Sequence, residues 1–271
     1  HGLEADVTAK HLLRDVIADG YARGRGEKLP GGAITQLAWP GPSNKSGAST
    51  ALLPIDETPD YFDGNLNDWQ PIGPRELGDQ DDTAAIQRAI DSGKPVIYFP
   101  NNRTYFLSDT VAIRGAVRQV IGFNSEISLG AAQRPFSDAA NPRPLFRIDH
   151  TNGPVSIEQM FFNAQYPGEV LIENNSPQPL TIAHCGGWVG AKGHRHAYRN
   201  TAVATGPVYI EDCFLPGWEF TGQSVWARQL NPENPDGDGV EPQVLNDGGR
   251  LWTSEERRVG KECRSQWSPY P

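Results

Sequence analysis

Three ten-residue segments in the second half of the chain repeat one pattern of apolar and polar positions. They align without gaps and read GPVSIEQMFF (153–162), QPLTIAHCGG (178–187) and GPVYIEDCFL (206–215). Their prolines are 25 and 28 residues apart, and a second short apolar run precedes each segment. Two short strands and polar turns at this interval are typical of a solenoid, because a single coil cannot bury its inner face alone. We therefore expect an all-β fold, a single-stranded right-handed parallel β-helix over about residues 95–252, with the hand given by the rule for parallel crossovers.

The alignment also predicts which side chains lie inside the solenoid. Successive side chains of a strand point to opposite faces. The predicted inward residues are Val155, Leu180 and Val208, then Ile157, Ile182 and Ile210, then Met160, Cys185 and Cys213.

A helix is expected at the N-terminal end of the solenoid. The stretch GDQDDTAAIQRAIDSG places Ala85, Ile86, Ala89 and Ile90 on one face. Asp81 and Asp82 provide an N-cap signal, and Gly93 is a stop signal, so the pattern predicts a helix at about residues 82–91. The short apolar run KPVIYFP follows as the first strand.

The two ends of the chain differ from this repeating region. Leu12, Leu13, Val16 and Ile17 have helical spacing, so residues 1–55 are expected to form an N-terminal helix (7–19) and a linker rich in Gly, Pro and Ser (24–49). Residues 254–271, SEERRVGKECRSQWSPYP, resemble the translation of a DNA-sequencing adapter. We expect this segment to be non-native and residues 56–253 to be a C-terminally truncated solenoid domain.

The stretch GDQDDTAAIQRAIDSGKPVIYFPNNRTYFLSDTV resembles the opening of pectate-lyase-superfamily domains, the rhamnogalacturonase/epimerase-like β-helices. The usual Gly-Asp-Gly loop is shortened here to Gly-Asp-Gln. The resemblance implies a right-handed β-helix with a capping helix and a polysaccharide as partner. That family includes exo-β-1,3-glucanase-like hydrolases, pectin-active enzymes and phage tail spikes. The matching residues are Asp81, Asp82, Thr83, Ala85, Ile86, Ala89, Ile90, Tyr98, Phe99, Pro100 and Tyr105.

Composition and charge narrow the range of partners. The chain has 271 residues with 29 Gly and 23 Pro, which is typical of a turn-rich folded protein. It carries 24 basic and 33 acidic residues, a net charge of −9, so we expect no nucleic acid as partner. No run of 18 apolar residues occurs, so the sequence predicts no membrane-spanning helix.

The repeat places acidic residues in columns on the outer wall. Glu158, Ala183 and Glu211 occupy the same outward position of successive coils. Glu158 and Glu211 are then two coils apart, about 9–10 Å, at the upper edge of the carboxylate separation used by inverting glycosidases. We expect Glu211 to act as general acid and Glu158 as base. A solvated wall with no catalytic role would carry such residues too.

A second polar column follows, with Gln159, His184 and Asp212 at equal positions. His184 and Asp212 are further catalytic candidates, because they add an acid and a base one coil apart. Sugar rings stack on aromatic faces, so Trp188, Trp218 and Trp226 are candidate substrate-binding residues, together with Arg228.

The sequence gives no metal site. The segment 184–196 contains His184, Cys185, His194 and His196, but the inward position of Cys185 favours a packed thiol over a zinc ligand. The loop 234–241 lacks the ligand spacing of a calcium-binding EF-hand. No cofactor is expected, except calcium if the reaction is an elimination.

Two functional hypotheses follow. The first is a secreted or periplasmic enzyme that degrades a polysaccharide, either a glycoside hydrolase (exo-β-1,3-glucanase-like or pectin-active) or a polysaccharide lyase. The alternative is a non-catalytic carbohydrate-binding or tail-spike-like β-helix. The oligomeric state is left open.

Overall fold

The computed structural model describes residues 11–18, 23–24, 27–28, 32–39, 58–59, 61, 63–100, 102–130, 134–189, 196–232 and 243–254. The chain divides into two compact units, residues 1–55 and 56–271. Of the segment 254–271, only Ser254 lies within the described residues.

The N-terminal unit contains strands where a helix was expected. β1 (His11–Ala18) pairs antiparallel with β4 (Gly32–Trp39), and β2 (Arg23–Gly24) pairs with β3 (Glu27–Lys28). The predicted helix at 7–19 is therefore wrong, and the predicted linker contains β4. The apolar residues of HLLRDVIA fit both periods over so short a run. A partner strand decides between them, because a short isolated helix is marginal in water whereas β1 and β4 satisfy each other's backbone groups.

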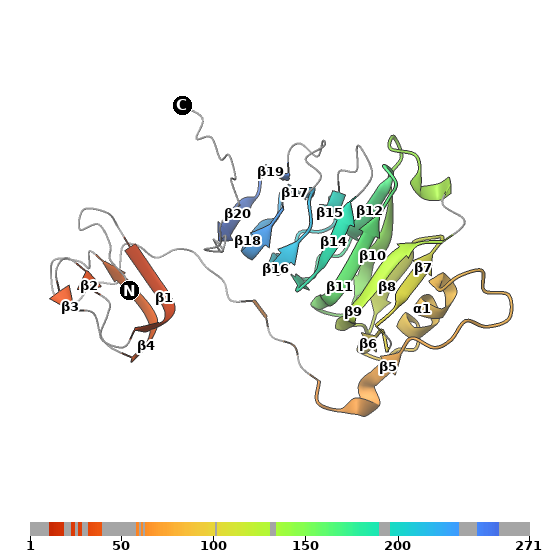
Figure 1. Cartoon of the computed structure of the whole chain (residues 1–271), viewed down its shortest axis with the longest axis horizontal. Coiled ribbons are helices and arrows are strands. Elements are labelled where there is room, and N and C mark those ends of the chain that lie inside the picture. The colour runs from red at the N-terminus through yellow and green to blue at the C-terminus, as the bar shows by residue number, and fades with distance from the viewer. Residues whose placement is uncertain are drawn as a thin grey trace. The chain divides into compact units, whose positions relative to one another are not determined.

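The second unit is an all-β, parallel, solenoid-like fold with two long sheets (Figure 1). In each sheet, neighbouring strands come from successive coils and run parallel. In the order of pairing, the six-stranded sheet consists of β19 (Val244–Asp247), β17 (Trp218–Thr221), β15 (His196–Asn200), β12 (Glu169–Asn174), β10 (Arg143–Thr151) and β8 (Val111–Gly115).

The ten-stranded sheet has a main path of eight strands. In order they are β20 (Arg250–Ser254), β18 (Ser224–Asn231), β16 (Val208–Phe214), β13 (Leu180–Ala183), β11 (Val155–Ala164), β9 (Gln119–Leu129), β6 (Val96–Tyr98) and β5 (Trp69–Pro71). β14 (Gly186–Val189) pairs with β11 and β16, and β7 (Thr104–Leu107) pairs with β9. The 3-10 turns η1 (Leu66–Asp68) and η2 (Arg134–Phe136) complete the described elements.

The core lies between the sheets and confirms the predicted register. Ile157 pairs with Ile182, and Ile182 pairs with Ile210; all three are fully buried. Met160, Cys185 and Cys213 are also buried. Burial raises the pKa of the Cys213 thiol, consistent with a packed, protonated side chain.

The helix α1 (Thr83–Ile90) covers β8 at the N-terminal end of the solenoid, close to the expected range (Figure 1). Its buried face carries Ala85, Ile86, Ala89 and Ile90. Asp81 accepts a hydrogen bond from the Thr83 N–H. Asp82 instead binds the Arg75 and Arg103 guanidinium groups and the Phe106 N–H. Burial by itself would raise the pKa of Asp82, but these donors outweigh burial and lower it.

One corner of the ten-stranded sheet bends at the same position in successive coils. Gln159, His184, Asp212 and Gln229 have φ of 54°, 54°, 46° and 54°. L-residues rarely adopt this left-handed region, which typically costs about 1 kcal/mol or more. We call these four residues the left-handed corner. Each of them directly follows a residue of the acidic column or its register partner Arg228. The corner therefore ends the strand segment that carries that residue.

Candidate functional site

The backbone register confirms that Glu158 and Glu211 occupy one column of the ten-stranded sheet. Glu158 pairs with Ala183, and Ala183 pairs with Glu211. Since neighbouring strands lie about 4.8 Å apart, the Cα atoms of the two glutamates are about 9–10 Å apart. The intervening residue, Ala183, contributes only a methyl group. Ala183 is 7% exposed, and no long side chain of the column lies between the two glutamates.

Glu158 is held by two hydrogen-bond donors. The Gln119 amide donates to Oε1 at 2.9 Å, and the Ser156 hydroxyl donates to the same oxygen at 2.6 Å. Ser156 and Gln119 are register partners on β11 and β9, so the sheet positions both donors. Such donors orient the carboxylate. Glu158 is suited to accept a proton or a hydroxyl hydrogen bond.

Glu211 has surroundings that oppose the expected role of general acid. Its register partner Arg228 places Nη1 3.5 Å from Oε1, and the Thr58 hydroxyl donates to the same Oε1. A general acid must present a proton to the leaving group. Oε1 of Glu211 instead accepts from a hydroxyl and faces a guanidinium. Glu211 is therefore arranged as an ion-paired acceptor in this conformation.

The structure brings His184 and Asp212 together at the left-handed corner. His184 Nδ1 lies 3.4 Å from Asp212 Oδ2, and both side chains are more than half exposed. The His184 N–H donates to the Glu211 carbonyl at 2.8 Å, which connects the corner to the acidic column. The two side chains form a solvent-facing acid–base pair next to Glu211.

The predicted substrate-binding tryptophans fall into different environments. Trp218 is 1% exposed, packs against both Tyr198 and Phe220, and donates to the Leu215 carbonyl, so its prediction as a sugar contact is wrong. It begins β17, a strand of the six-stranded sheet, and its side chain points inward to fill the core.

The other two tryptophans belong to the ten-stranded sheet. Trp188 is 56% exposed and lies edge-on to Phe161. Trp226 is half-buried and stacks on Tyr209, with ring centroids 5.5 Å apart and an interplanar angle of 17°. Tyr209, Trp226 and Trp252 are register partners in one column. An aromatic column thus runs two residues before the column that contains Glu211 and Arg228.

A segment that precedes the solenoid crosses this face. We call residues 58–68 the strap, of which 60 and 62 are not among the described residues. Thr58 contacts Glu211 on β16, and the Tyr61 ring lies 4.8 Å from the guanidinium carbon of Arg118, just before β9. In the sheet, β13 and β11 lie between β16 and β9. The strap therefore passes over the strands that carry Ala183 and Glu158.

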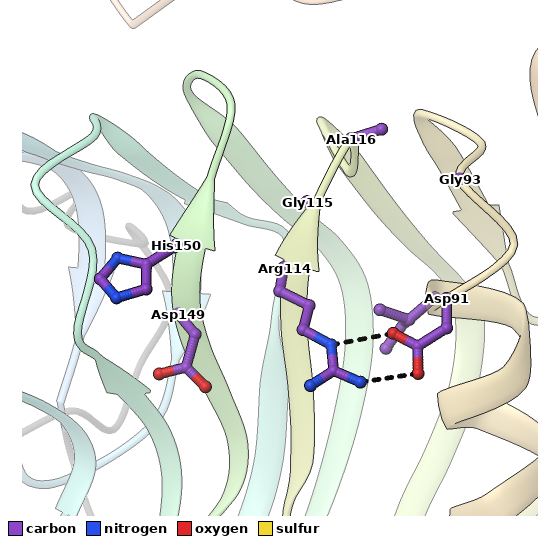
Figure 2. A pocket seen from close by; sticks show the side chains of 8 residues that line it. Asp91, Gly93, Arg114, Gly115, Ala116, Asp149 and His150 are labelled. Atoms are coloured by element: carbon purple, nitrogen blue, oxygen red, sulfur yellow. Dashed lines mark hydrogen bonds and ion pairs between the residues drawn. The ribbon is translucent and has the colours of Figure 1, made fainter.

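A pocket lies on the other sheet, where sequence reasoning predicted none (Figure 2). Its volume is about 580 Å³, and its polar lining comes from Asp91, Arg114, Asp149 and His150. Asp91 directly follows α1, Arg114 lies on β8, and Asp149 and His150 lie on β10. The pocket is thus formed where α1 covers the edge strand of the six-stranded sheet.

Two ion pairs define the pocket's charge. Arg114 Nε and Nη2 donate to the Asp91 carboxylate at 2.9 and 2.8 Å. Arg147 donates to both oxygens of Asp149, and the Asn175 amide donates to Oδ1 at 3.0 Å. The hydrogen bond from Arg114 lowers the pKa of Asp91. Burial acts to raise the pKa of Asp149, but Arg147 and Asn175 outweigh burial and lower it. Both carboxylates are ionised near neutral pH.

A signal for this pocket was present in the sequence. Ile113 pairs with Ile148, so Arg114 and Asp149 each follow the same coil position on β8 and β10. Aligning the second apolar run of each coil, VAIRG with FRIDH, would have placed them together. The alignment of residues 153–162, 178–187 and 206–215 does not include these runs, and the helical pattern accounts for the residues near 91.

The zinc hypothesis has no support among the described residues. Cys185 is buried whereas His184 is exposed, and His196 lies 3.1 Å from Glu219. No group of three His, Cys, Asp or Glu side chains in the described part of the chain could hold a metal ion. His194 and the loop 234–241 lie outside the described residues.

The comparisons add no family name. No protein-family model matches the chain, and no curated protein is similar to it in sequence. Within the described residues, no helix combines the length and apolar character needed to cross a membrane.

Proposed function

We propose that this protein acts on a polysaccharide along the outer face of the ten-stranded sheet, with Glu158 and Glu211 as the reacting carboxyl groups. The observation that carries the proposal is the acidic column, in which the two glutamates are two strands apart with only Ala183 between them. A separation of about 9–10 Å is at the upper edge of the range in which a water molecule fits between the carboxylates of an inverting glycosidase. We also propose that the coils wind with a right hand and that the protein is secreted or periplasmic.

The chemistry divides between the two glutamates. Glu158, oriented by Gln119 and Ser156, is the general base that takes a proton from the attacking water. Glu211 is the general acid, and its Oε1 is available to the substrate only when the contacts with Thr58 and Arg228 are lost. Hydrolysis therefore requires the strap to leave the acidic column and the Arg228 side chain to turn away when the polysaccharide binds. Trp188 and Trp226 would contact the sugar rings on either side.

An elimination reaction would use the same face differently. In a lyase, Arg228 would neutralise a uronate carboxylate and a glutamate would remove the neighbouring proton, with calcium as an optional counter-ion. The products differ from those of hydrolysis, because elimination leaves an unsaturated uronate at the new chain end.

A second candidate function is non-catalytic carbohydrate binding. The observation that favours it is the ion pair between Glu211 and Arg228 together with the Thr58 contact, which occupy Oε1 of Glu211. A binding protein needs acceptors and aromatic faces but no proton donor.

The test is cleavage of laminarin, pectin and polygalacturonate, followed by reducing-end formation and by the ultraviolet absorbance of unsaturated uronate. We expect Glu158→Gln and Glu211→Gln each to lower turnover by about 10²-fold or more. Glu126→Gln is the matched control, because Glu126 lies on β9 and accepts an amide hydrogen bond from Asn163 outside the acidic column. Wild-type turnover in both column variants would overturn the proposal. Binding without cleavage by the wild-type protein would favour the second candidate.

A further inference from the structure

We propose that the pocket between α1, β8 and β10 binds a neutral sugar unit through adjacent hydroxyl groups. The inference rests on the proposed function for its source of ligand, the polysaccharide, but it uses none of the residues of the acidic column. It adds a second carbohydrate site on the six-stranded sheet.

The balance of charge in the pocket disfavours an ionic ligand. Arg114 neutralises Asp91, and Arg147 neutralises Asp149. A metal cation would have to displace the Arg114 guanidinium, which lies between the two carboxylates (Figure 2). An anion such as a uronate would meet Asp91 and Asp149, both ionised. A neutral ligand avoids both costs.

Unused hydrogen-bonding capacity points to hydroxyl groups. Nε and Nη2 of Arg114 bind Asp91, whereas Nη1 has no hydrogen-bond partner among the described residues. Figure 2 shows the guanidinium between Asp91 and Asp149. A hydroxyl can accept from Arg114 and donate to Asp149, and a neighbouring hydroxyl on the same sugar ring can reach His150. Hydrogen bonds to charged groups are the stronger ones, and the ion pairs fix their positions before the ligand arrives.

The structure also holds these groups rigidly. Gln87 on α1 exchanges hydrogen bonds with both backbone groups of Ala112 on β8, at 2.9 and 3.1 Å. The same amide lies 3.2 Å from Asp91 Oδ2. Asp149 is fixed from the next coil by Asn175. The volume of about 580 Å³ accommodates one or two sugar rings, and the rest of the lining is small or apolar, including Gly93, Gly115 and Ala116.

Calorimetric titration with laminaritriose, a neutral sugar, and with trigalacturonate, an anionic one, tests the inference. We expect laminaritriose to bind and trigalacturonate to bind at least about tenfold more weakly. Arg114→Lys keeps the charge beside Asp91 but loses the planar donor set, so laminaritriose affinity should fall about tenfold or more. Arg143→Lys is the matched control, because Arg143 pairs with Asp109 outside the pocket and should leave affinity unchanged.

A second variant separates binding from folding. Ala116→Phe fills the pocket without removing a charge, and it should abolish laminaritriose binding while thermal unfolding stays cooperative. Unchanged affinity in Arg114→Lys and Ala116→Phe would overturn the inference, as would equal affinity for both trisaccharides. Glu211→Gln should leave trisaccharide binding at the pocket intact. Absence of cleavage by the wild-type protein, with trisaccharide binding at the pocket retained, would therefore count against the proposed function alone.

Discussion

The outer faces of the two sheets use the same coil spacing in different ways. On the six-stranded sheet, Arg147, Glu173 and Arg199 are register partners, so opposite charges lie on neighbouring strands. Arg199 donates to Glu173 at 2.7 Å. On the ten-stranded sheet, Ala183 interrupts the column between Glu158 and Glu211. Donors outside the column contact both glutamates: Gln119 and Ser156 donate hydrogen bonds to Glu158, and Thr58 donates one to Glu211.

This difference distinguishes a structural column from one that is available for chemistry. Opposite charges on neighbouring strands satisfy each other and contribute about 0.2–1 kcal/mol per pair. A carboxylate next to an alanine keeps acceptor capacity for a ligand. At the edge of the six-stranded sheet, Arg114 faces the pocket.

The largest expected effect concerns Glu169, a buried exception on the paired face. Glu169 begins β12 and is fully buried; its Oε2 accepts from the Tyr166 N–H, and its Oε1 has no hydrogen-bond partner among the described residues. Burial raises the pKa of Glu169 to about 7 from an ordinary value of 4.5. Between pH 4.5 and about 7, Glu169 of the folded protein binds a proton that the unfolded chain lacks. The contribution of Glu169 to the free energy of unfolding therefore falls as the pH rises through this range.

Glu169→Gln removes this titration and should stabilise the protein at pH 8 relative to wild type by up to about 3 kcal/mol. The two proteins should be nearly equal at pH 4.5. Urea unfolding of both at each pH measures the difference. A difference that does not change with pH would show that Glu169 titrates normally.

An intermediate effect compares one glutamate from each face. Glu173→Gln removes the carboxylate charge that pairs with the Arg199 guanidinium. This change should lower the free energy of unfolding by about 1–3 kcal/mol. Glu158→Gln keeps a carbonyl acceptor for Gln119 and Ser156 and should cost under about 0.5 kcal/mol. Denaturant unfolding at neutral pH ranks the two variants. If Glu158→Gln proved the more costly, the contrast between the faces would be lost.

The smallest effect concerns the strap. Thr58→Val removes the hydroxyl that contacts Glu211 while keeping the side-chain shape. We expect a loss of stability of about 1 kcal/mol or less and a two- to fivefold gain in turnover on the true substrate, since opening the acidic column becomes easier. Steady-state kinetics and thermal unfolding check both parts. Lower turnover would mean that Thr58 helps to bind the substrate.

The sequence predicted the register of the solenoid but not its corners. Pro, Ile and Met or Cys recur because each occupies a fixed place in the coil, so Ile182 could be assigned correctly. His184 and Asp212 belong to residue types that are enriched in the left-handed region, but these types also occur in ordinary strands and turns, so residue type alone did not single out the corner.

The strands of the six-stranded sheet were harder to predict than those of the ten-stranded sheet. The turns between the two sheets differ in length, so the apolar runs of the six-stranded sheet do not align by eye, and Trp218 was wrongly placed outside. The pocket was missed for the same reason, because Arg114 and Asp149 belong to strands of the six-stranded sheet. The N-terminal strands were missed because β1 depends on a partner, β4, that lies more than a dozen residues away.

The left-handed corner has a consequence for how such a protein evolves. In four coils the bend falls at one residue of positive φ, and its side chain is not always the same: Gln159, His184, Asp212 and Gln229; on β9 two residues, Phe123 and Asn124, have positive φ. The bend therefore tolerates a change of side chain without a change of fold. Duplication of a whole coil would add another bend of the same form and another set of outward positions. A lineage of this protein could thus lengthen its surface and vary its chemistry independently, whereas an insertion of one residue within a strand would turn the following side chains of that strand to the wrong face.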